Sequence, residues 1–302
     1  MKQHLKAIVL FVGLSNILFA AADDGPRMYW NAPVGTNILQ PFFWAASGNL
    51  LSPKSAKSGL DTDIDIGILS YSRIIDIAGH SAIPTVVILG GDVSGSYNDH
   101  KLSSASGFGD LYIQGTINIF GAPALSEKEF ATYKQDTVLS FFVGVTAPTG
   151  AYDGDRLLNL GENRWNIHVG LPFMQTLGEW IPGEITTLEI LPAVWFYGDN
   201  DNSFGSKIKQ DPMYTLEAHI TRDITTSTFV SVDYFVQRVG DSFTDGQQTG
   251  HANTSDSLGF TVGYMFNEQT QLQLRYASTL SPSSKDQEYD ADMFQFNLNY
   301  FW

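Results

Sequence analysis

The chain has 302 residues, a formal net charge of −15 and no cysteine. Nucleic acid is excluded as a partner class, because its binding normally requires a basic face, and the absence of cysteine excludes a disulfide-stapled scaffold. Charged residues make up only 16% of the sequence, which is below the roughly 25% of soluble globular proteins and disfavours a wholly water-exposed surface.

The first 22 residues have the pattern of a secretory signal peptide. Lys2 and Lys6 flank a basic start, an apolar run follows over residues 7–19, and alanines at positions 20–22 supply small residues for cleavage. The alternative, an uncleaved membrane anchor, is disfavoured because the run is shorter than the roughly 20 residues of a spanning helix. We therefore expect export by the Sec route and one mature domain over residues 23–302.

Apolar and polar residues alternate from about residue 36 onwards, which is the signature of strands with two different faces. Residues 258–266 and 272–276 are the clearest cases, and the chain between them contains Asn267 and Glu268, as in a tight hairpin. No apolar run after residue 22 is long enough for a spanning helix, so a membrane location would require a β-barrel. The sequence predicts twelve strands, over residues 36–49, 62–78, 82–96, 108–120, 136–147, 164–176, 184–199, 211–223, 226–239, 255–266, 269–280 and 289–302.

The connections between these strands alternate in length. Those after odd-numbered strands are long and rich in Gly, Ser, Asn and Asp, whereas those after even-numbered strands are short, except for residues 121–135, which could hold a short helix. Long extracellular loops and tight periplasmic turns are typical of outer-membrane barrels. We therefore predict an all-β, transmembrane antiparallel barrel of about twelve strands in the outer membrane of a Gram-negative bacterium, with a secreted β-sandwich as the alternative.

The two faces of the strands differ in composition. The polar face carries small and amide side chains such as Gln271 and Gln273, which suit a confined, hydrated lumen better than a surface in bulk water. The apolar face carries aromatic residues that either settle at the membrane interfaces or fill a core: Trp44, Trp165, Trp180, Trp195, Tyr264, Tyr276, Tyr300 and Trp302.

Charged residues on the polar face are the candidate permeation residues. The phase of alternation places the following in the lumen: Asp63, Asp65, Glu189, Glu217, His219, Asp233, Gln237 and Arg275. Because acids outnumber bases, one reading is a lumen that favours cations and neutral solutes. The other is that these charges form salt bridges that brace the wall. Four aromatic residues that could contact aromatic solutes are also expected inside: Phe108, Phe120, Phe229 and Phe235.

Motifs for catalysis or metal binding are absent from the sequence. No two histidines after residue 22 lie within four positions of each other, and no G-x-S-x-G elbow occurs. We therefore predict that the protein is not an enzyme and needs no cofactor; a catalytic triad would require a Ser or Asp within reach of a histidine. Residues 199–202 and 153–155 supply oxygen atoms that could bind calcium, but such residues are equally typical of polar turns.

The C-terminal stretch "FQFNLNYFW" predicts the last strand. Phe294, Phe296, Leu298, Tyr300 and Trp302 would face lipid, and the residues between them the lumen. The strand is expected to pair with the first one, because a spanning barrel leaves no open edge. The pattern also resembles the recognition signal that the barrel assembly machinery reads, carried here by Phe296, Leu298, Tyr300 and Trp302.

Four stretches resemble the family named after the meta-pathway of phenol degradation: "SGFGDLYIQGTINIFG", "VTAPTGAYDGDRLLNLGENRW", "LEILPAVWFYGDNDN" and "KQDPMYTLEAHITRDI". The resemblance implies an outer-membrane barrel that passes hydrophobic or aromatic compounds. We expect a channel or transporter for passive uptake of such small solutes. The alternatives are a structural or surface-interaction barrel with a closed lumen and, less favoured, an outer-membrane enzyme. The expected partners are outer-membrane lipid, lipopolysaccharide bridged to acidic loops by divalent cations, the assembly machinery and the solute.

Overall fold

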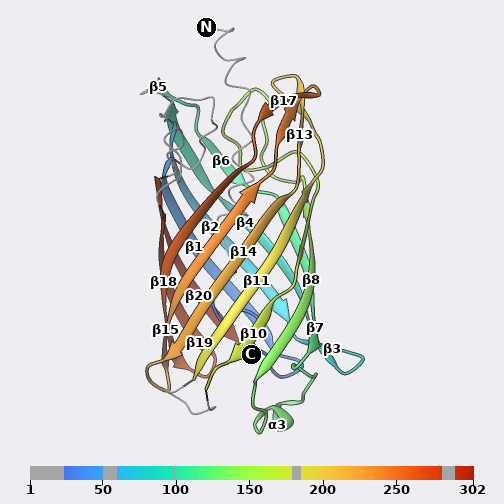
Figure 1. Ribbon diagram of the computed structural model, residues 1–302, viewed down its shortest axis with the longest axis vertical. Helices are drawn as coiled ribbons and strands as arrows, with labels where there is room; N and C mark the ends of the chain where they lie inside the picture. Colours follow the sequence, from blue (N-terminus) through green and yellow to red (C-terminus); the bar gives the residue numbers. More distant parts are fainter. Residues whose placement is uncertain (1–23, 50–59, 98–99, 179–184, 281–289) are drawn as a thin grey trace.

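A computed structural model of the protein shows a closed β-barrel (Figure 1), and it describes residues 24–49, 60–97, 100–178, 185–280 and 290–302. The predicted signal peptide, residues 1–22, lies outside the described residues. Among the residues that are described, no helix is long and apolar enough to cross a membrane.

The wall of the barrel consists of twelve antiparallel spans, which confirms the predicted number and order of strands. The spans are β1 (Asn37–Asn49), β2 (Leu60–Arg73), β4 (His80–Tyr97), β6 with β7 (Ala105–Phe108 and Leu111–Phe120), β8 (Thr137–Ala147), β9 with β10 (Asn166–Gly170 and Phe173–Thr176), β11 (Thr186–Tyr197), β14 (Met213–Asp223), β15 (Thr228–Val239), β18 (Asn253–Asn267), β19 (Thr270–Thr279) and β20 (Asp290–Phe301). The ring is complete because β1 pairs with both β2 and β20.

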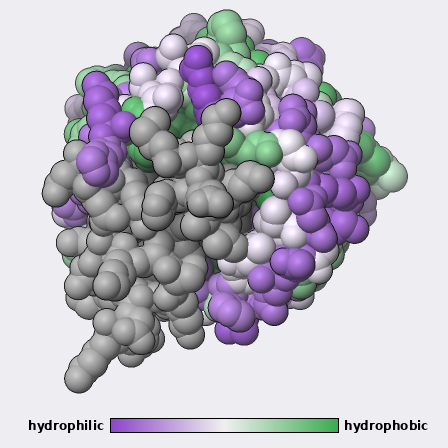
Figure 2. All heavy atoms as spheres, turned by 90° about the horizontal axis from the view of Figure 1, so that it is seen from above, coloured by the Kyte–Doolittle hydropathy of each residue, from purple (hydrophilic) through white to green (hydrophobic). Residues whose placement is uncertain are grey.

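Smaller elements lie at the two ends. At one end a separate sheet of four short strands, β12 (Asn200–Ser203), β13 (Ser206–Gln210), β16 (Ser242–Thr244) and β17 (Gln247–Gly250), rises above the wall. Seen from above, most described residues at this end are hydrophilic (Figure 2). The shorter β3 (Ile75–Ile77) and β5 (His100–Lys101) pair with β4.

A short helix lies at the opposite end, beside the C-terminus (Figure 1). It is α3 (Glu127–Phe130), and it begins with a capping box in which Ser126 and Glu129 accept from each other's backbone N–H groups. The long connection of residues 121–135 therefore holds the helix that the sequence suggested. Short turns at this end and long connections at the other are the arrangement of periplasmic and extracellular ends in outer-membrane barrels.

The outer face of the wall is apolar, as a lipid-facing surface requires. Phe260 is 57% exposed and Val232 46%. Aromatic residues predicted for the outer face are exposed there: Trp165, Tyr264, Tyr276, Tyr300 and Trp302. Trp44 and Trp195 take the other role that the sequence left open, because both point into the barrel and are buried in a core. Trp180 lies outside the described residues.

A small hydrophobic core fills the extracellular half of the barrel from inside. Trp44 on β1 and Ile64 and Ile66 on β2 are fully buried against Leu158 and Leu160 of the connection between β8 and β9. The isoleucines of β2 therefore face inward, and the residues that alternate with them face outward.

The predicted lumen positions of Asp63 and Asp65 are consequently wrong. Both side chains are exposed on the outer face near the extracellular end of β2. Alternation alone assigns the apolar face to lipid, and here that assignment fails because the lumen contains its own hydrophobic core.

In the span formed by β6 and β7, a bulge between the two strands changes which alternate side chains face the lumen. β4 pairs with β6 at Gly90–Phe108 and with β7 at Val87–Tyr112, so the stretch around Gly109 and Asp110 contains one residue more than the stretch of β4 opposite. Phe108 is therefore outside and 73% exposed, contrary to the prediction. Phe120 is exposed as well, next to a register shift at the end of β7. Phe229 and Phe235 are buried inside, as predicted.

The seam between the last and first strands is held at its end by Trp302. The Asn37 N–H donates to Trp302 O over 2.8 Å and the Trp302 N–H returns to Asn37 O over 3.1 Å. The Trp302 ring lies against Tyr300 and Tyr71. The predicted pairing of the C-terminal strand with the first strand is confirmed.

Candidate functional site: the barrel lumen

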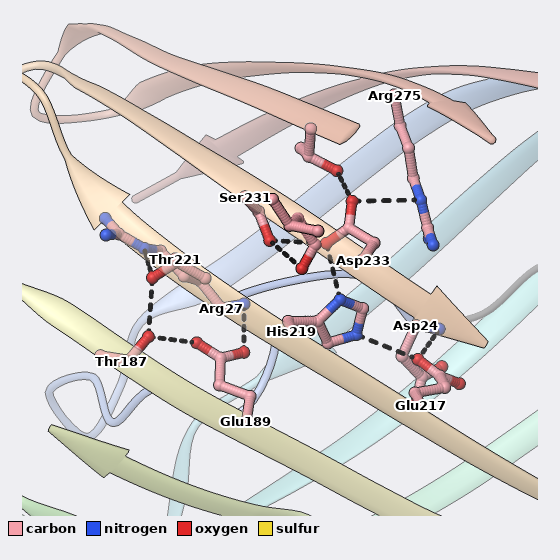
Figure 3. Close-up of polar contacts among 12 residues, drawn as sticks. Asp24, Arg27, Thr187, Glu189, Glu217, His219, Thr221, Ser231, Asp233 and Arg275 are labelled. Carbon is pink, nitrogen blue, oxygen red and sulfur yellow. Dashed lines mark hydrogen bonds and ion pairs between the residues drawn. The ribbon is translucent and has the colours of Figure 1, made fainter. Parts of the chain in front are cut away.

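A polar network covers the inner face of β11, β14, β15, β18 and β19 (Figure 3). Asp233 is its centre and is completely buried. Its carboxylate lies 2.7 Å from His219 Nδ1 and accepts from the Ser231 and Thr261 hydroxyls at 2.6 Å each. Arg275 Nε lies 3.6 Å away. The surrounding donors satisfy a carboxylate that would otherwise be very costly to bury.

The chain before β1 lies inside the barrel and contacts this network. Residues 24–36, which we call the lumen segment, run across the inner face of β11 and β14. The Asp24 N–H donates to Glu217 Oε2 over 3.0 Å, and the Arg27 N–H to Glu189 Oε2 over 2.6 Å (Figure 3). The predicted lumen acids Glu189 and Glu217 therefore accept hydrogen bonds from the backbone of this segment.

Arg27 is the principal anchor of the lumen segment. Its guanidinium forms an ion pair of 2.7 Å with Asp223, and its Nε donates to Thr221 Oγ1 over 3.1 Å. The same guanidinium lies 4.4 Å from the ring centroid of Trp30 and 4.1 Å from that of Phe229. Charge pairing and cation–π contact thus act on one side chain in a site shielded from solvent.

Three further contacts fix the rest of the lumen segment. Trp30 Nε1 donates to Glu189 Oε1 over 3.0 Å, and the Tyr29 ring stacks on Phe142 of β8. Asn31 joins the segment to the chain around α3, because its N–H donates to Gln135 Oε1 over 2.6 Å. The lumen segment is therefore held inside the periplasmic half of the barrel by contacts on several sides.

A cavity of about 470 Å³ remains between the lumen segment and the wall. Its sides differ in chemistry. Strands β1, β2 and β4, with Ile74 directly after β2, present apolar side chains, and those of the strands are Ile38, Phe42, Ile68, Ile83, Val87 and Leu89. Strands β19 and β20 present amides, namely Gln271, Gln273, Gln295, Asn297 and Asn299.

Three rings of the wall complete the cavity. His168 stacks on Trp195 with a centroid distance of 3.9 Å and an interplanar angle of 13°. Tyr112 contacts both, and its hydroxyl lies 3.2 Å from His168 Nδ1. Sequence reasoning left Trp195 open between the membrane interface and a core, and it overlooked this cluster, although His168 has the lumen phase in its strand.

A loop closes the extracellular side of the lumen. Asp110, which the bulge turns inward, accepts from the Gly150 and Glu162 N–H groups over 2.7 Å each. Glu162 in turn pairs with Arg164 over 2.8 Å, and the Arg164 guanidinium covers the Tyr197 ring at 4.3 Å. The bulge thus positions a carboxylate that holds the connection between β8 and β9 inside the barrel mouth.

An enzyme with a catalytic triad would require a Ser or Asp within hydrogen-bond distance of a histidine, and Asp233 lies at that distance from His219. The Ser231 hydroxyl, however, donates to Asp233 and not to the imidazole. The other imidazole nitrogen faces Glu217 at 3.4 Å. Within the described residues the histidine therefore bridges two acids, an arrangement that braces the wall.

The acidic loop residues singled out as calcium ligands have cationic partners. Asp199 and Asp201 lie 2.7 and 2.9 Å from Lys207 Nζ, and Asp153 lies 3.0 Å from Arg156. No group of three or more His, Asp or Glu side chains among the described residues is arranged to hold a metal ion. The structure therefore favours ion-pairing roles for these acids.

The structure brings together five of the predicted lumen residues. Glu189, Glu217, His219, Asp233 and Arg275 are all buried on the inner face. Glu217, His219 and Arg275 belong to the set of contacts around Asp233, whereas Glu189 belongs to a second set with Thr187, Thr221 and Arg27 (Figure 3). What sequence reasoning missed is the lumen segment itself. The signal was an arginine and two aromatic residues, Tyr29 and Trp30, in a stretch without strand alternation.

Comparison with known proteins agrees with this architecture. The COG4313 outer membrane channel from Pseudomonas putida F1 matches with a TM-score of 0.74 and 23% identity, over 92% of this chain and 99% of that one. The transport unit of the autotransporter AIDA-I from Escherichia coli matches with a TM-score of 0.52 and 9% identity, over 95% of each chain. These likenesses show the barrel fold. None of the curated proteins compared with the chain is similar to it.

A family model gives the more specific result. The family described as "Putative MetA-pathway of phenol degradation" matches residues 34–295, from the end of the lumen segment to the middle of β20. The match includes the bulge at Gly109, the connection that closes the barrel mouth and the strands that carry the lumen network. The chain belongs to this family of outer-membrane β-barrels.

Proposed function

We propose that the protein is an outer-membrane channel through which small hydrophobic or aromatic solutes pass by diffusion, without a cofactor or a catalytic step. The observation that carries this proposal is the internal cavity, whose volume of about 470 Å³ lies in the range of small-molecule sites. Such sites are mostly apolar with a few convergent polar groups. Here the apolar side of β1, β2 and β4 faces the amides of β19 and β20.

The ring cluster gives the cavity a preference for flat solutes. The stacked pair of His168 and Trp195 offers an aromatic surface, and the Tyr112 hydroxyl offers a polar contact. Aromatic pairs gain about 0.5–1.5 kcal/mol beyond the burial of area. A phenol-like solute would thus bind more tightly than an aliphatic one of equal size.

The test is uptake by a deletion strain across matched aromatic and aliphatic carbon sources. We expect slower growth and slower uptake of the aromatic compounds at low concentration, restored by the wild-type gene and only partly by a Trp195→Ala variant. His100→Ala, at an exposed position on the extracellular side, is the matched control and should restore uptake fully. Equal uptake by the deletion strain and the complemented strain would contradict the proposal.

A second candidate function is favoured by a specific observation. The lumen segment occupies part of the periplasmic half of the barrel and the hydrophobic core around Trp44 fills the extracellular half, as in a structural or surface-interaction barrel whose long loops contact partners. Single-channel recording separates the two: discrete openings of the purified protein support a channel, whereas a permanently silent protein, together with unaltered uptake in the deletion strain, supports the structural role.

The partners and the export route belong to the same proposal. Residues 1–22 would direct export by the Sec route, and the side chains of Phe296, Leu298, Tyr300 and Trp302 would be read by the barrel assembly machinery. Tyr300 and Trp302 are exposed on the outer face at the end of the seam, where such a reader could reach them. Outer-membrane lipid would cover the apolar belt, and lipopolysaccharide would contact the hydrophilic extracellular end. The lumen residues Glu189, Glu217, His219, Asp233 and Arg275 would tune permeation by holding the lumen segment.

A further inference from the structure

A chain of hydrogen bonds along the inner face of β7 ends at His168. Gln114 Nε2 donates to Thr116 Oγ1 over 3.0 Å, and Gln114 Oε1 accepts from the Tyr112 hydroxyl over 2.6 Å. The Tyr112 oxygen also lies 3.2 Å from His168 Nδ1, on β9. We call the three residues of β7, namely Thr116, Gln114 and Tyr112, the β7 relay. It connects three alternate side chains of one strand to an imidazole on another.

The direction of the hydrogen bonds in the β7 relay fixes the position of the proton on the imidazole. A tyrosine hydroxyl has a single proton, and that of Tyr112 is donated to Gln114. The contact between Tyr112 and His168 is therefore a hydrogen bond only if the imidazole donates through its Nδ1–H. An uncharged imidazole with its proton on Nδ1 has a lone pair on Nε2. This second nitrogen is then a hydrogen-bond acceptor.

The surroundings of His168 keep the imidazole uncharged. Its ring contacts are with Tyr112, Phe142 and Trp195, and none of these side chains could balance a positive charge. A buried charge without a partner is very costly. The imidazole of His219 differs, because it lies between two acids. The proton on Nδ1 is therefore the one that the His168 ring carries.

The accepting nitrogen of His168 has no donor. Its Nε2 atom is buried and makes no hydrogen bond to any of the described residues. The residue is only 8% exposed, and it borders the internal cavity. A buried acceptor without a donor costs free energy. A solute that donates a hydrogen bond to Nε2 would recover this cost.

The acidic side chains that border the same cavity are acceptors as well. Asp24 accepts from the Tyr29 hydroxyl, and Glu217 accepts from the Asp24 N–H (Figure 3). A carboxylate has no proton to donate, and it repels another anion. Arg27 also borders the cavity, but its guanidinium is paired with Asp223. These acids therefore also favour a solute that donates hydrogen bonds and carries no negative charge.

We propose that His168 selects solutes by their polar group. Its Nε2 accepts a hydrogen bond from uncharged aromatic compounds that carry a donor, such as an aromatic hydroxyl or amino group, and the β7 relay holds the imidazole in the accepting tautomer. Aromatic carboxylates are rejected, because they meet acceptors only. The Tyr29 ring, which belongs to the lumen segment and not to a strand, shifts away from Phe142 to admit the solute. The inference rests on the proposed function and names the chemical class of the solute.

The experiment is equilibrium dialysis of the purified protein in detergent micelles, with protein-free micelles as the reference. Three compounds with the same ring are compared: phenol carries a donor, anisole has a methoxy group in its place, and benzoate carries a negative charge. We expect the wild type to bind phenol about tenfold more tightly than anisole, which corresponds to about 1.4 kcal/mol. Benzoate should bind more weakly than either.

The role of His168 is tested by His168→Phe, which keeps a ring against Trp195 but lacks the lone pair. The variant should bind anisole as the wild type does and phenol about tenfold more weakly, so that the preference disappears. His80→Phe is the matched control. His80 is exposed at the start of β4 and does not border the cavity, so this variant should keep the preference of the wild type.

The β7 relay is tested at Gln114. Gln114→Leu removes the acceptor of the Tyr112 proton, which can then turn to His168 Nδ1 and leave the imidazole proton on Nε2. The preference for phenol should be largely lost. Gln114→Glu still accepts from Tyr112 and should keep the preference. A merely structural role of residue 114 would weaken the binding of phenol and anisole alike.

The outcomes separate the two proposals. Equal affinity of the wild type for phenol and anisole, tight binding of benzoate, or an unchanged preference in His168→Phe would overturn the role of His168 and leave the aromatic cavity in place. Loss of the preference in both Gln114 variants would overturn the relay. A wild type that binds none of the three compounds would overturn the proposed function, because the cavity carries that proposal.

Discussion

Asp233 shows how individual residues hold the lumen together. A buried carboxylate is stable only when donors surround it, and here His219, Ser231, Thr261 and Arg275 approach it from four strands. The contacts cross the ladders between β14, β15, β18 and β19. Asp233 therefore links the side chains of these neighbouring strands on the inner face of the wall.

The first prediction concerns Asp233→Asn. The amide cannot accept from all of these donors, and it leaves Arg275 and His219 without their carboxylate, so the free energy of unfolding should fall by about 3 kcal/mol. Urea unfolding of the protein in detergent micelles, followed by heat-modifiable migration, measures this loss. Asp65→Asn, on the exposed outer face, is the control and should be nearly neutral. Equal stability of the two variants would contradict the bracing role.

Side-chain direction was predictable for some residues and not for others, for a physical reason. Alternation places Glu217 and His219 correctly, because β14 has lipid on one face and the polar lumen on the other. It fails for Asp63 and Asp65, because the lumen at their level contains the core formed with Leu158 and Leu160. It also fails at Phe108, where a single added residue reverses the phase. Such a bulge depends on tertiary contacts of Asp110 that a local pattern does not reveal.

At the scale of elements, the lumen segment is the part of the structure most suited to movement. It has no regular secondary structure, and its contacts to the wall are side-chain contacts and single hydrogen bonds. Among the side chains of the lumen segment, that of Arg27 makes the most contacts, with one ion pair, one hydrogen bond and two ring contacts. Displacement of this segment would widen the cavity, which is already bordered at the periplasmic end by Ile74 and Phe301.

The second prediction is that Arg27→Ala widens the axial path through the lumen. The variant loses the ion pair with Asp223 and the contacts with Trp30 and Phe229, so the segment should detach from the wall. The single-channel conductance should then rise about threefold, which corresponds to a barrier lowered by about 0.7 kcal/mol. Planar-bilayer recordings measure it. Arg156→Ala, in an exposed extracellular ion pair, should behave like the wild type; an unchanged conductance in Arg27→Ala would show that this segment is not the barrier.

The third prediction concerns the extracellular sheet. The hydrogen bond from Lys207 holds the pKa of Asp199 below its usual value. A lowered carboxyl pKa stabilises the folded state above the unfolded value, near about 4, and this contribution is lost as the pH falls through the lower, folded-state value. Backbone hydrogen exchange in β13, corrected for intrinsic rates, should therefore be constant from pH 6 down to about 4 and accelerate as the pH falls below about 4.

The control for this pH effect is Lys207→Ala. The variant lacks the cation that lowers the pKa of Asp199, so exchange in β13 should already be fast near neutral pH and should change little on acidification. A wild-type sheet whose protection is the same above and below about pH 4 would show that the Lys207 cluster does not order it.

Element boundaries were the most predictable part of the fold. All twelve predicted strands lie on observed spans, because a strand with two different faces carries its signal in every second residue. The short strands β12, β13, β16 and β17 were not predicted, since they lie in stretches rich in Gly, Ser, Asn and Asp with no apolar face. The lumen segment was missed because its apolar residues are buried without any period.

At the scale of the whole molecule, charge is distributed unevenly between wall and lumen. The lumen contains five acidic side chains, those of Asp24, Glu189, Glu217, Asp223 and Asp233. It contains three basic side chains close to them, those of Arg27, Arg275 and His219. Several of these charges neutralise each other in pairs. The remaining excess is acidic, in keeping with the net charge of −15 of the chain.

The fourth prediction follows from this excess. The open channel should conduct small cations better than anions, because charged rings in a pore set its selectivity. Reversal potentials under a potassium chloride gradient measure the preference, with Arg27→Ala used to raise the current. The double variant Glu189→Gln with Glu217→Gln should reduce the cation preference, whereas the surface variant Asp65→Asn should not. Anion selectivity of the wild type would contradict the prediction.

The position of the lumen segment in the sequence has a consequence for assembly. Asp24 and Glu217 are 193 residues apart, and Arg27 and Glu189 are 162 apart. Strands β11 and β14 must therefore be in place before the segment has anything to bind, and contacts between such distant residues form slowly. Docking of the segment is then a late step of assembly, which can occur only after the wall opposite β1 has formed. A barrel that lacks this wall would retain an undocked, protease-sensitive N-terminal segment, by which incomplete molecules could be recognised and degraded.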